Sequence, residues 1–175
     1  MLKLEEYLSE IGKALAGTQA SIDEASEVLR KASIYGGHRI WVLGNGGSLA
    51  IAQHFAQDLL KLGDVRAHAM NCPSIITAYS NDDHFDRSFF SPISRLADKG
   101  DPIVIFSCSG KSRNYVEFVS GFVDVRNPLI SVVGTDGGFL KSKSHVSVHI
   151  KSHDYQVCES AFCIVADLML KKIME

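Results

Sequence analysis

Residues 40–48 read IWVLGNGGS, an apolar run of strand length that passes directly into a glycine-rich loop. Residues 103–112 repeat the arrangement as IVIFSCSGKS, with serines in place of most of the glycines. Further apolar runs of similar length occupy residues 67–70, 129–133 and 146–150. Because several of these runs are continuously apolar, they fit strands that are covered on both faces, as in a parallel sheet.

Helical patterns separate the strands, over residues 48–61, 112–123 and 155–174. Residues 2–33 also carry apolar side chains at helical spacing, and Gly17 can divide this stretch in two. The alternation predicts an α/β fold, a doubly wound parallel sheet of five strands flanked by helices, as a single domain over residues 1–175. We expect residues 1–35 to form an N-terminal helical extension whose amphipathic character suits contact with another subunit.

The composition excludes several classes of protein. The chain has 175 residues, of which 46% are hydrophobic and 22% charged, as in an ordinary globular domain. Its formal net charge of −2 argues against a nucleic-acid partner, and no apolar run is long enough for a membrane span. The four cysteines form no CxxC pair, and the N-terminus lacks the apolar core of a signal peptide. We therefore expect reduced thiols in a cytoplasmic protein, without structural zinc on cysteines.

The glycine-rich loop has the chemistry of a phosphate-binding site. Gly44, Gly46 and Gly47 let the backbone approach a ligand closely, and the helix that starts near Ser48 offers free N–H groups at its positive dipole end. The alternative is a glycine turn that only caps the helix. Leu49 stands where a dinucleotide-binding fingerprint needs its third glycine, so we expect no nucleotide cofactor.

The serine-rich loop points to the same ligand. Ser107, Ser109 and Ser112 place three hydroxyls beside Gly110 at the start of a helix, and Lys111 can add a positive charge. The alternative is that Ser112 only caps the helix, and we expect capping to be part of its role. One serine would suffice for a cap, so three favour a phosphate cradle.

Five motifs then follow one another along the chain: Gly44–Ser48, His54, Asn81–Asp82, Ser107–Ser112 and Thr135–Gly138. In this order they resemble the sugar isomerase (SIS) domain family, and within it the phosphoheptose isomerase group, over nearly the whole chain. The resemblance implies an isomerase that converts sedoheptulose 7-phosphate to D-glycero-D-manno-heptose 7-phosphate, for lipopolysaccharide precursors. It also implies a homotetramer formed through the N-terminal helix. By itself, the segment Gly134–Gly138 reads as a structural turn.

The resemblance also assigns the substrate contacts. For the phosphate it implies Ser107, Cys108, Ser109 and Ser112, and for the sugar it implies Asn45, Gly46, Gly47, Ser48, Asp82 and Gln156. Asp154 is the alternative to Gln156. The family usually has threonine where this chain has Cys108, which weakens the cradle, and asparagine where it has Lys111, whose charge can compensate.

Aldose–ketose isomerisation needs a base, an acid and a group that stabilises the intermediate oxyanion. The resemblance implies Asp58 as base and Asp167 as acid, although relatives carry glutamate and histidine there. It also implies a divalent cation, zinc or another, on His54, Asp58, Glu159 and Asp167. Without a cation, three converging carboxylates would leave one of them protonated and able to act as acid. If the last helix is aligned one residue earlier, Cys158 and Ala166 take those two places, and both the metal and the acid are lost.

Three functions stay open at this point. The first is the isomerase of a seven-carbon sugar phosphate. The second is a catalytically altered protein that senses a sugar phosphate or binds a partner, as does a relative that binds the replication initiator DnaA. The third is an isomerase of another phosphosugar. The phosphate loops are common to all three, so only the altered acid and base positions discriminate among them.

Overall fold

The computed structural model describes residues 3–122 and 127–175, and its core is a sheet of five parallel strands. The strands are β1 (Ile40–Leu43), β2 (Ala67–Ala69), β3 (Ile103–Ser107), β4 (Leu129–Val133) and β5 (Val146–His149). They lie in the order β2-β1-β3-β4-β5, and every neighbouring pair is parallel. The predicted doubly wound α/β fold is confirmed.

The helices are α1 (Leu4–Leu15), α2 (Gln19–Arg30), α3 (Gly47–Lys61), α4 (Pro73–Asp82), α5 (Phe90–Leu96), α6 (Arg113–Gly121), α7 (Gly138–Lys143) and α8 (Tyr155–Met174). A π-helical segment, η1 (Lys31–Tyr35), continues α2, and η2 (Phe85–Arg87) is a short 3₁₀ turn. The predicted N-terminal helical stretch does divide at Gly17, whose φ is +81°. Leu2 and Val123, which end two of the predicted helices, lie outside the described residues.

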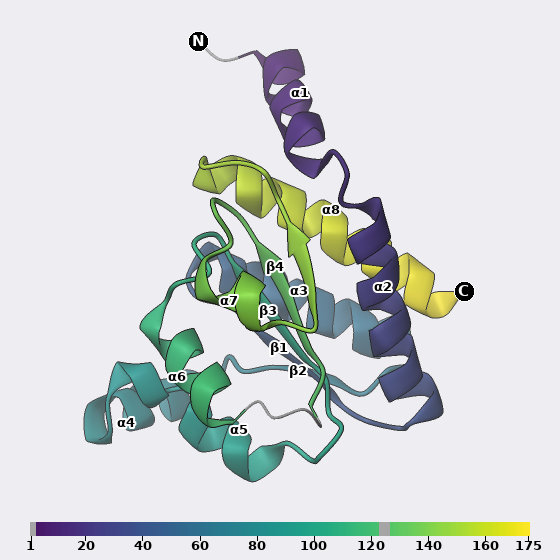
Figure 1. Ribbon diagram of the computed structural model, residues 1–175. Coiled ribbons are helices and arrows are strands. Elements are labelled where there is room, and N and C mark those ends of the chain that lie inside the picture. The colour runs from purple at the N-terminus through teal and green to yellow at the C-terminus, as the bar shows by residue number, and fades with distance from the viewer. Residues whose placement is uncertain (1–2, 123–126) are drawn as a thin grey trace.

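Helices cover both faces of the sheet (Figure 1). On one face α2, α3 and α8 pack on alternate strand residues such as Val42 and Phe106. On the other face α5, α6 and α7 pack on the intervening residues, such as Trp41 and Ile105. Every residue of β1, β3 and β4 is buried, which explains why these strands read as continuous apolar runs rather than alternating ones.

Helix α1 extends away from the body of the domain (Figure 1). It is held to α8 by a hydrogen bond of 3.0 Å between the Tyr7 hydroxyl and Ser160 Oγ. Ile11 and Ala14 are buried, whereas Leu4 and Leu8 are 68% and 57% exposed. Helix α1 therefore carries apolar surface that this chain does not itself cover.

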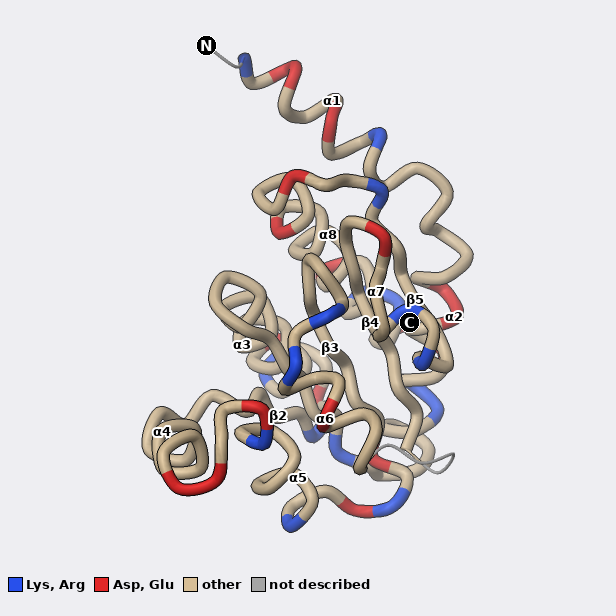
Figure 2. The backbone as a smooth tube through the Cα atoms, turned by 60° about the vertical axis from the view of Figure 1, so that its left-hand side comes forward, with Lys and Arg blue, Asp and Glu red and all other residues tan. Residues whose placement is uncertain are grey.

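Charges of both signs are interspersed along the chain (Figure 2), in keeping with the net charge of −2. Over residues 3–122 and 127–175, no helix has the length and apolar character that a membrane span requires.

Candidate active site

The loops after β1 and β3 meet at the carboxyl edge of the sheet. The two strands are neighbours, but the chain leaves β1 for β2 on its other side, so the strand order reverses here. Ligands of open parallel sheets bind at such a reversal. A cavity of about 340 Å³ opens at this point, which we call the loop pocket, and its volume lies in the range of small-molecule sites. It is lined by Asn45, Gly46, Gly47, Ser48, Phe106, Ser107, Cys108, Ser109, Ser112, Tyr115, Tyr155 and Glu159.

The glycine-rich loop Gly44–Ser48, which we call the glycine loop, places the N-terminus of α3 beside the loop pocket. Gly46 precedes the helix with φ +56° and ψ −126°, a conformation that a residue with a Cβ rarely adopts. A Cβ at Gly44 would collide with the backbone of Ser48 and Leu49, so the turn is tight. The first N–H groups of α3, which have no partner within the helix, therefore lie beside the pocket.

Asn45 links this loop to the helix that follows the serine loop. Its Nδ2 donates to Asn114 Oδ1 over 3.1 Å, and Asn114 Nδ2 donates back to Asn45 Oδ1 over 3.0 Å. Asn114 lies on α6 and is 0% exposed. Because an amide has two N–H donors and two acceptor lone pairs, Asn45 keeps one donor and one lone pair for a ligand.

The serine-rich loop Ser107–Ser112, which we call the serine loop, lines the same pocket with its three serines. Ser107 Oγ accepts a hydrogen bond from the N–H of Gly110 over 3.1 Å, and Ser109 Oγ accepts one from the N–H of Lys111 over 3.2 Å. Each of these hydroxyls therefore retains its own proton and can donate it to an acceptor in the pocket. Ser112 occupies the N-cap of α6, but its side chain makes no capping hydrogen bond. The expectation that Ser112 caps the helix through its side chain is thus wrong.

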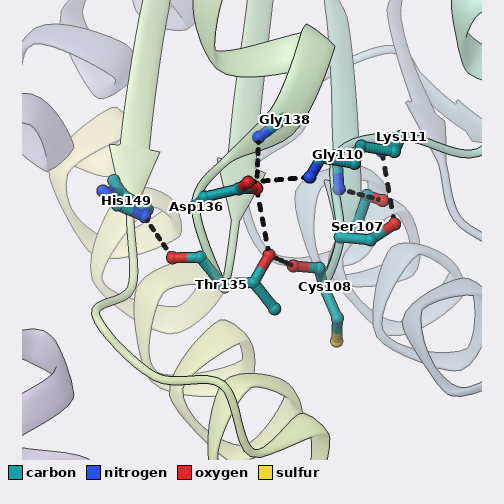
Figure 3. A network of polar contacts seen from close by, with 9 residues as sticks. Ser107, Cys108, Gly110, Lys111, Thr135, Asp136, Gly138 and His149 are labelled. Atoms are coloured by element: carbon teal, nitrogen blue, oxygen red, sulfur yellow. Dashed lines mark hydrogen bonds and ion pairs between the residues drawn. The ribbon is translucent and has the colours of Figure 1, made fainter.

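The loop after β4 braces the serine loop (Figure 3). Thr135 Oγ1 donates to the carbonyl of Cys108 over 3.2 Å, and the N–H of Leu140 donates to the carbonyl of Gly110 over 3.1 Å. The loop after β4 is itself held by β5, since His149 Nε2 lies 2.9 Å from the carbonyl oxygen of Thr135. This segment lines no part of the loop pocket, in agreement with its interpretation as a structural turn.

Lys111 contacts the loop after β4 and does not face the loop pocket. Its Nζ donates to Asp136 Oδ2 over 2.7 Å, and this hydrogen bond holds the pKa of Asp136 below its ordinary value (Figure 3). Lys111 does not line the pocket. The expectation that its ammonium compensates for Cys108 is therefore not met by this arrangement, since the charge is already paired.

Cys108 lies in the wall of the loop pocket next to a second buried thiol, Cys158 of α8. The hydrogen bond between them lowers the pKa of Cys158 to about 7, and the same hydrogen bond together with burial raises the pKa of Cys108. Cys158 also donates to the carbonyl of Ser152 over 3.3 Å. Cys108 is therefore the less acidic thiol of the pair and a weak donor in the wall of the loop pocket.

Glu159 is the one carboxylate among the described residues that line the loop pocket. It projects from α8 over the first turn of α3, where a Cβ on Gly47 would lie 2.5 Å from both of its oxygens. Ser48 Oγ is 3.4 Å from Glu159 Oε1. A carboxylate is favourably placed beside a helix N-terminus, because the helix dipole is positive there.

Asp58 and Asp167, the predicted base and acid, lie outside the loop pocket. His54 and Asp58 do meet, as their spacing on one helical face predicts, with His54 Nε2 at 3.1 Å from Asp58 Oδ2. Together with Asp167 they line a separate shallow hollow between α3 and α8, beside Ala166 and Cys163. Because Ala166 and Asp167 border the same hollow, its lining does not decide between the two alignments of the last helix.

The four predicted metal ligands are not gathered into one site. Glu159 faces the loop pocket, whereas His54, Asp58 and Asp167 face the other hollow. Glu159 and Asp167 are separated along the axis of α8, because eight residues advance an α-helix by about 12 Å. They therefore lie on a similar side of the helix but at different positions along it. Across the described part of the chain, no three or more His, Cys, Asp or Glu side chains form a group that could hold a metal. These residues do not fit the implied cation.

Two predicted sugar contacts also lie outside the loop pocket. Asp82 ends α4, is exposed and accepts a hydrogen bond of 2.8 Å from Asn81. Gln156 borders a hollow formed with α1, beside Tyr7 and the alternative residue Asp154. Asp154 instead caps α8, with Oδ1 accepting from the N–H groups of Gln156 and Val157.

Three aromatic residues of the wall were missed by sequence reasoning. Tyr115 is buried, with its hydroxyl 3.5 Å from the carbonyl of Phe106, and Phe106 precedes the serine loop. Tyr155 opens α8 and is more exposed. Its position directly after the loop that follows β5 is the one available signal, since that loop ends at the same edge of the sheet as the other two.

Comparisons with known proteins place this chain in a family. A family model described as the SIS domain matches residues 4–134, a span that contains both the glycine loop and the serine loop. The chain belongs to the SIS domain family. The phosphoheptose isomerase of Geobacter sulfurreducens is 33% identical over 96% of this chain and 92% of its own length. That of Geobacter metallireducens is 37% identical over 70% of this chain and 68% of its own.

A solved structure has a similar overall fold. The phosphoheptose isomerase of Neisseria gonorrhoeae is 26% identical, with a TM-score of 0.89 over 97% of this chain and 93% of that one. Glu159 lies beyond the residues that the SIS family model matches. The SIS family model thus spans the two loops, whereas α8, which carries Glu159, lies beyond it.

Proposed function

We propose that this chain is a phosphosugar aldose–ketose isomerase with sedoheptulose 7-phosphate as its substrate. The observation that carries the proposal is the loop pocket, in which the hydroxyls of a serine loop and the N-terminus of a helix face a carboxylate. Relatives named phosphoheptose isomerase, at 30–37% identity, support the choice of substrate.

The chemistry divides between the two sides of the pocket. Ser107, Ser109 and Ser112 donate hydrogen bonds to the phosphate, which places the sugar chain along the pocket. A base removes one proton from C1 of the ketose, and the electrons of that bond form an enediol with C2. A proton then adds to C2, while the C1 hydroxyl proton passes to solvent and O2 gains one. No atom is lost overall, and the product is the aldose.

The test is conversion of sedoheptulose 7-phosphate by the purified protein, followed by NMR. Fructose 6-phosphate and arabinose 5-phosphate serve as comparison substrates for the third function. Turnover of the heptulose at the highest kcat/KM supports the proposal. Faster turnover of another phosphosugar replaces the substrate but keeps the reaction class.

A second function is a protein that binds a sugar phosphate without converting it. The position of Asp58 and Asp167 outside the loop pocket favours it, because the acid and base that the family resemblance implies are not beside the bound sugar. Calorimetry separates the two functions. Binding of sedoheptulose 7-phosphate without turnover and without exchange of its C–H protons supports this second function.

We also propose a cytoplasmic homotetramer that contributes to lipopolysaccharide precursors and assembles through α1. The exposed Leu4 and Leu8 support the assembly surface. Light scattering on the protein and on the variant Leu4→Lys/Leu8→Lys tests it, and an unchanged mass would contradict a role for α1. A zinc ion is no part of the proposal, because the predicted ligands do not meet.

A further inference from the structure

We propose that Glu159 is the proton-transfer residue of the loop pocket, a role that rests on the proposed isomerase function. The reaction needs a base that touches the carbons next to the carbonyl, and therefore a base within the same cavity as the phosphate loops. Among the described residues of the pocket wall, Glu159 alone carries a carboxylate. Asp58, in contrast, accepts a hydrogen bond from the neighbouring Gln57 over 3.0 Å and contacts His54 in the other hollow.

The surroundings of Glu159 hold its carboxylate in place. Gly47 has no side chain, and a Cβ there would lie 2.5 Å from both carboxylate oxygens and would displace the carboxylate. On the same turn the buried Ser48 hydroxyl reaches Oε1 at 3.4 Å, a long contact of the kind that can tighten when substrate binds. Gly47 is thus a positioning residue, because it leaves the space that the carboxylate occupies.

One carboxylate suffices for the whole transfer. Glu159 takes the C1 proton of the ketose and becomes a carboxylic acid, while the C–H electrons form the C1–C2 double bond of the enediol. The same carboxyl group then returns a proton to C2 and is a carboxylate again. The hydroxyl protons on O1 and O2 exchange with water. The N–H groups at the start of α3 lie on the same side and can stabilise the oxygen that becomes negative.

The experiment compares Glu159→Gln with Asp58→Asn and with Glu24→Gln, an exposed charge-matched control on α2. We expect Glu159→Gln to lower kcat roughly 10²- to 10⁴-fold, the contribution typical of a general base, with little change in KM. Proton exchange at C1 in D₂O should fall equally. Glu159→Asp should recover part of the rate, and the other two variants should stay within about threefold of wild type. Each measurement is made with EDTA and with added zinc.

The second variant is Gly47→Ala, which keeps the carboxylate but displaces it. A displacement of about 1 Å can cost on the order of 10²-fold in kcat, and the binding of sedoheptulose 7-phosphate in calorimetry should change less than the rate.

If both the wild type and the Glu159→Gln variant are active, the role of Glu159 is overturned but the isomerase function is not. A larger loss of kcat in Asp58→Asn than in Glu159→Gln has the same consequence. A Glu159→Gln loss that appears only with zinc would make Glu159 a ligand and not the base. Wild type that binds the substrate without turnover or exchange overturns the isomerase and the base together.

Discussion

Gly110→Ala should break the contact between the serine loop and the loop that braces it. Gly110 has φ +62°, and a Cβ there would collide with the carbonyl oxygen of Gly137, a backbone atom that cannot rotate away. Gly37→Ala is the matched control, because Gly37 has φ +68° and a Cβ there would meet nothing within 4 Å. Both variants carry the left-handed penalty, and only Gly110→Ala adds the collision.

The magnitudes follow from these two terms. A left-handed alanine costs about 1–2 kcal/mol, which is the expected fall in the free energy of unfolding for Gly37→Ala. Overpacking against a rigid neighbour costs about 1–3 kcal/mol more, so the fall should be larger for Gly110→Ala by that amount. Because the collision displaces the serines, Gly110→Ala should also raise KM for sedoheptulose 7-phosphate, whereas Gly37→Ala should not.

The assays are urea unfolding, followed by circular dichroism, and steady-state kinetics of both variants. Equal losses of stability in the two variants would refute the reasoning, since they would show that the brace yields without cost. An unchanged KM in Gly110→Ala would show that the serine loop keeps its geometry without the close approach of Gly110 to Gly137.

Three further predictions concern the pocket and the sheet. Ser109→Ala removes one donor to a charged phosphate and should raise KM roughly 10- to 100-fold in steady-state kinetics; an unchanged KM would take Ser109 out of the cradle. Asn45→Ala strips the buried Asn114 of its partner and should lower the free energy of unfolding in urea by about 1–3 kcal/mol, so full stability would contradict that dependence. Burial, and next the charge of Arg39, lower the pKa of His68 below 6.5, so the unfolded chain takes up this proton first and stability falls as the pH drops below about 6.5, levelling off below the folded-state pKa. His68→Gln should remove that part of the pH dependence of unfolding, and an identical pH profile would disprove it.

The strands could be predicted because residues buried on both faces of the sheet are apolar in an unbroken run. Trp41, Val42 and Leu43 are apolar without alternation, since helices cover both faces of β1. Helix α4 was missed for the opposite reason. It has no buried residue, so no apolar periodicity marks it, and the short helices α5 and α7 carry few core positions.

The sequence by itself determined that two strand tips carry a glycine-rich and a serine-rich loop, because glycine and serine act through local backbone geometry and hydroxyl groups. It also determined the contact of His54 with Asp58, which depends on one helical turn. Only the tertiary structure decided which carboxylate faces the glycine and serine loops. That choice depends on the level at which α8 crosses α3, and a helix that advances about 1.5 Å per residue separates Glu159 from Asp167 although both lie on a similar side.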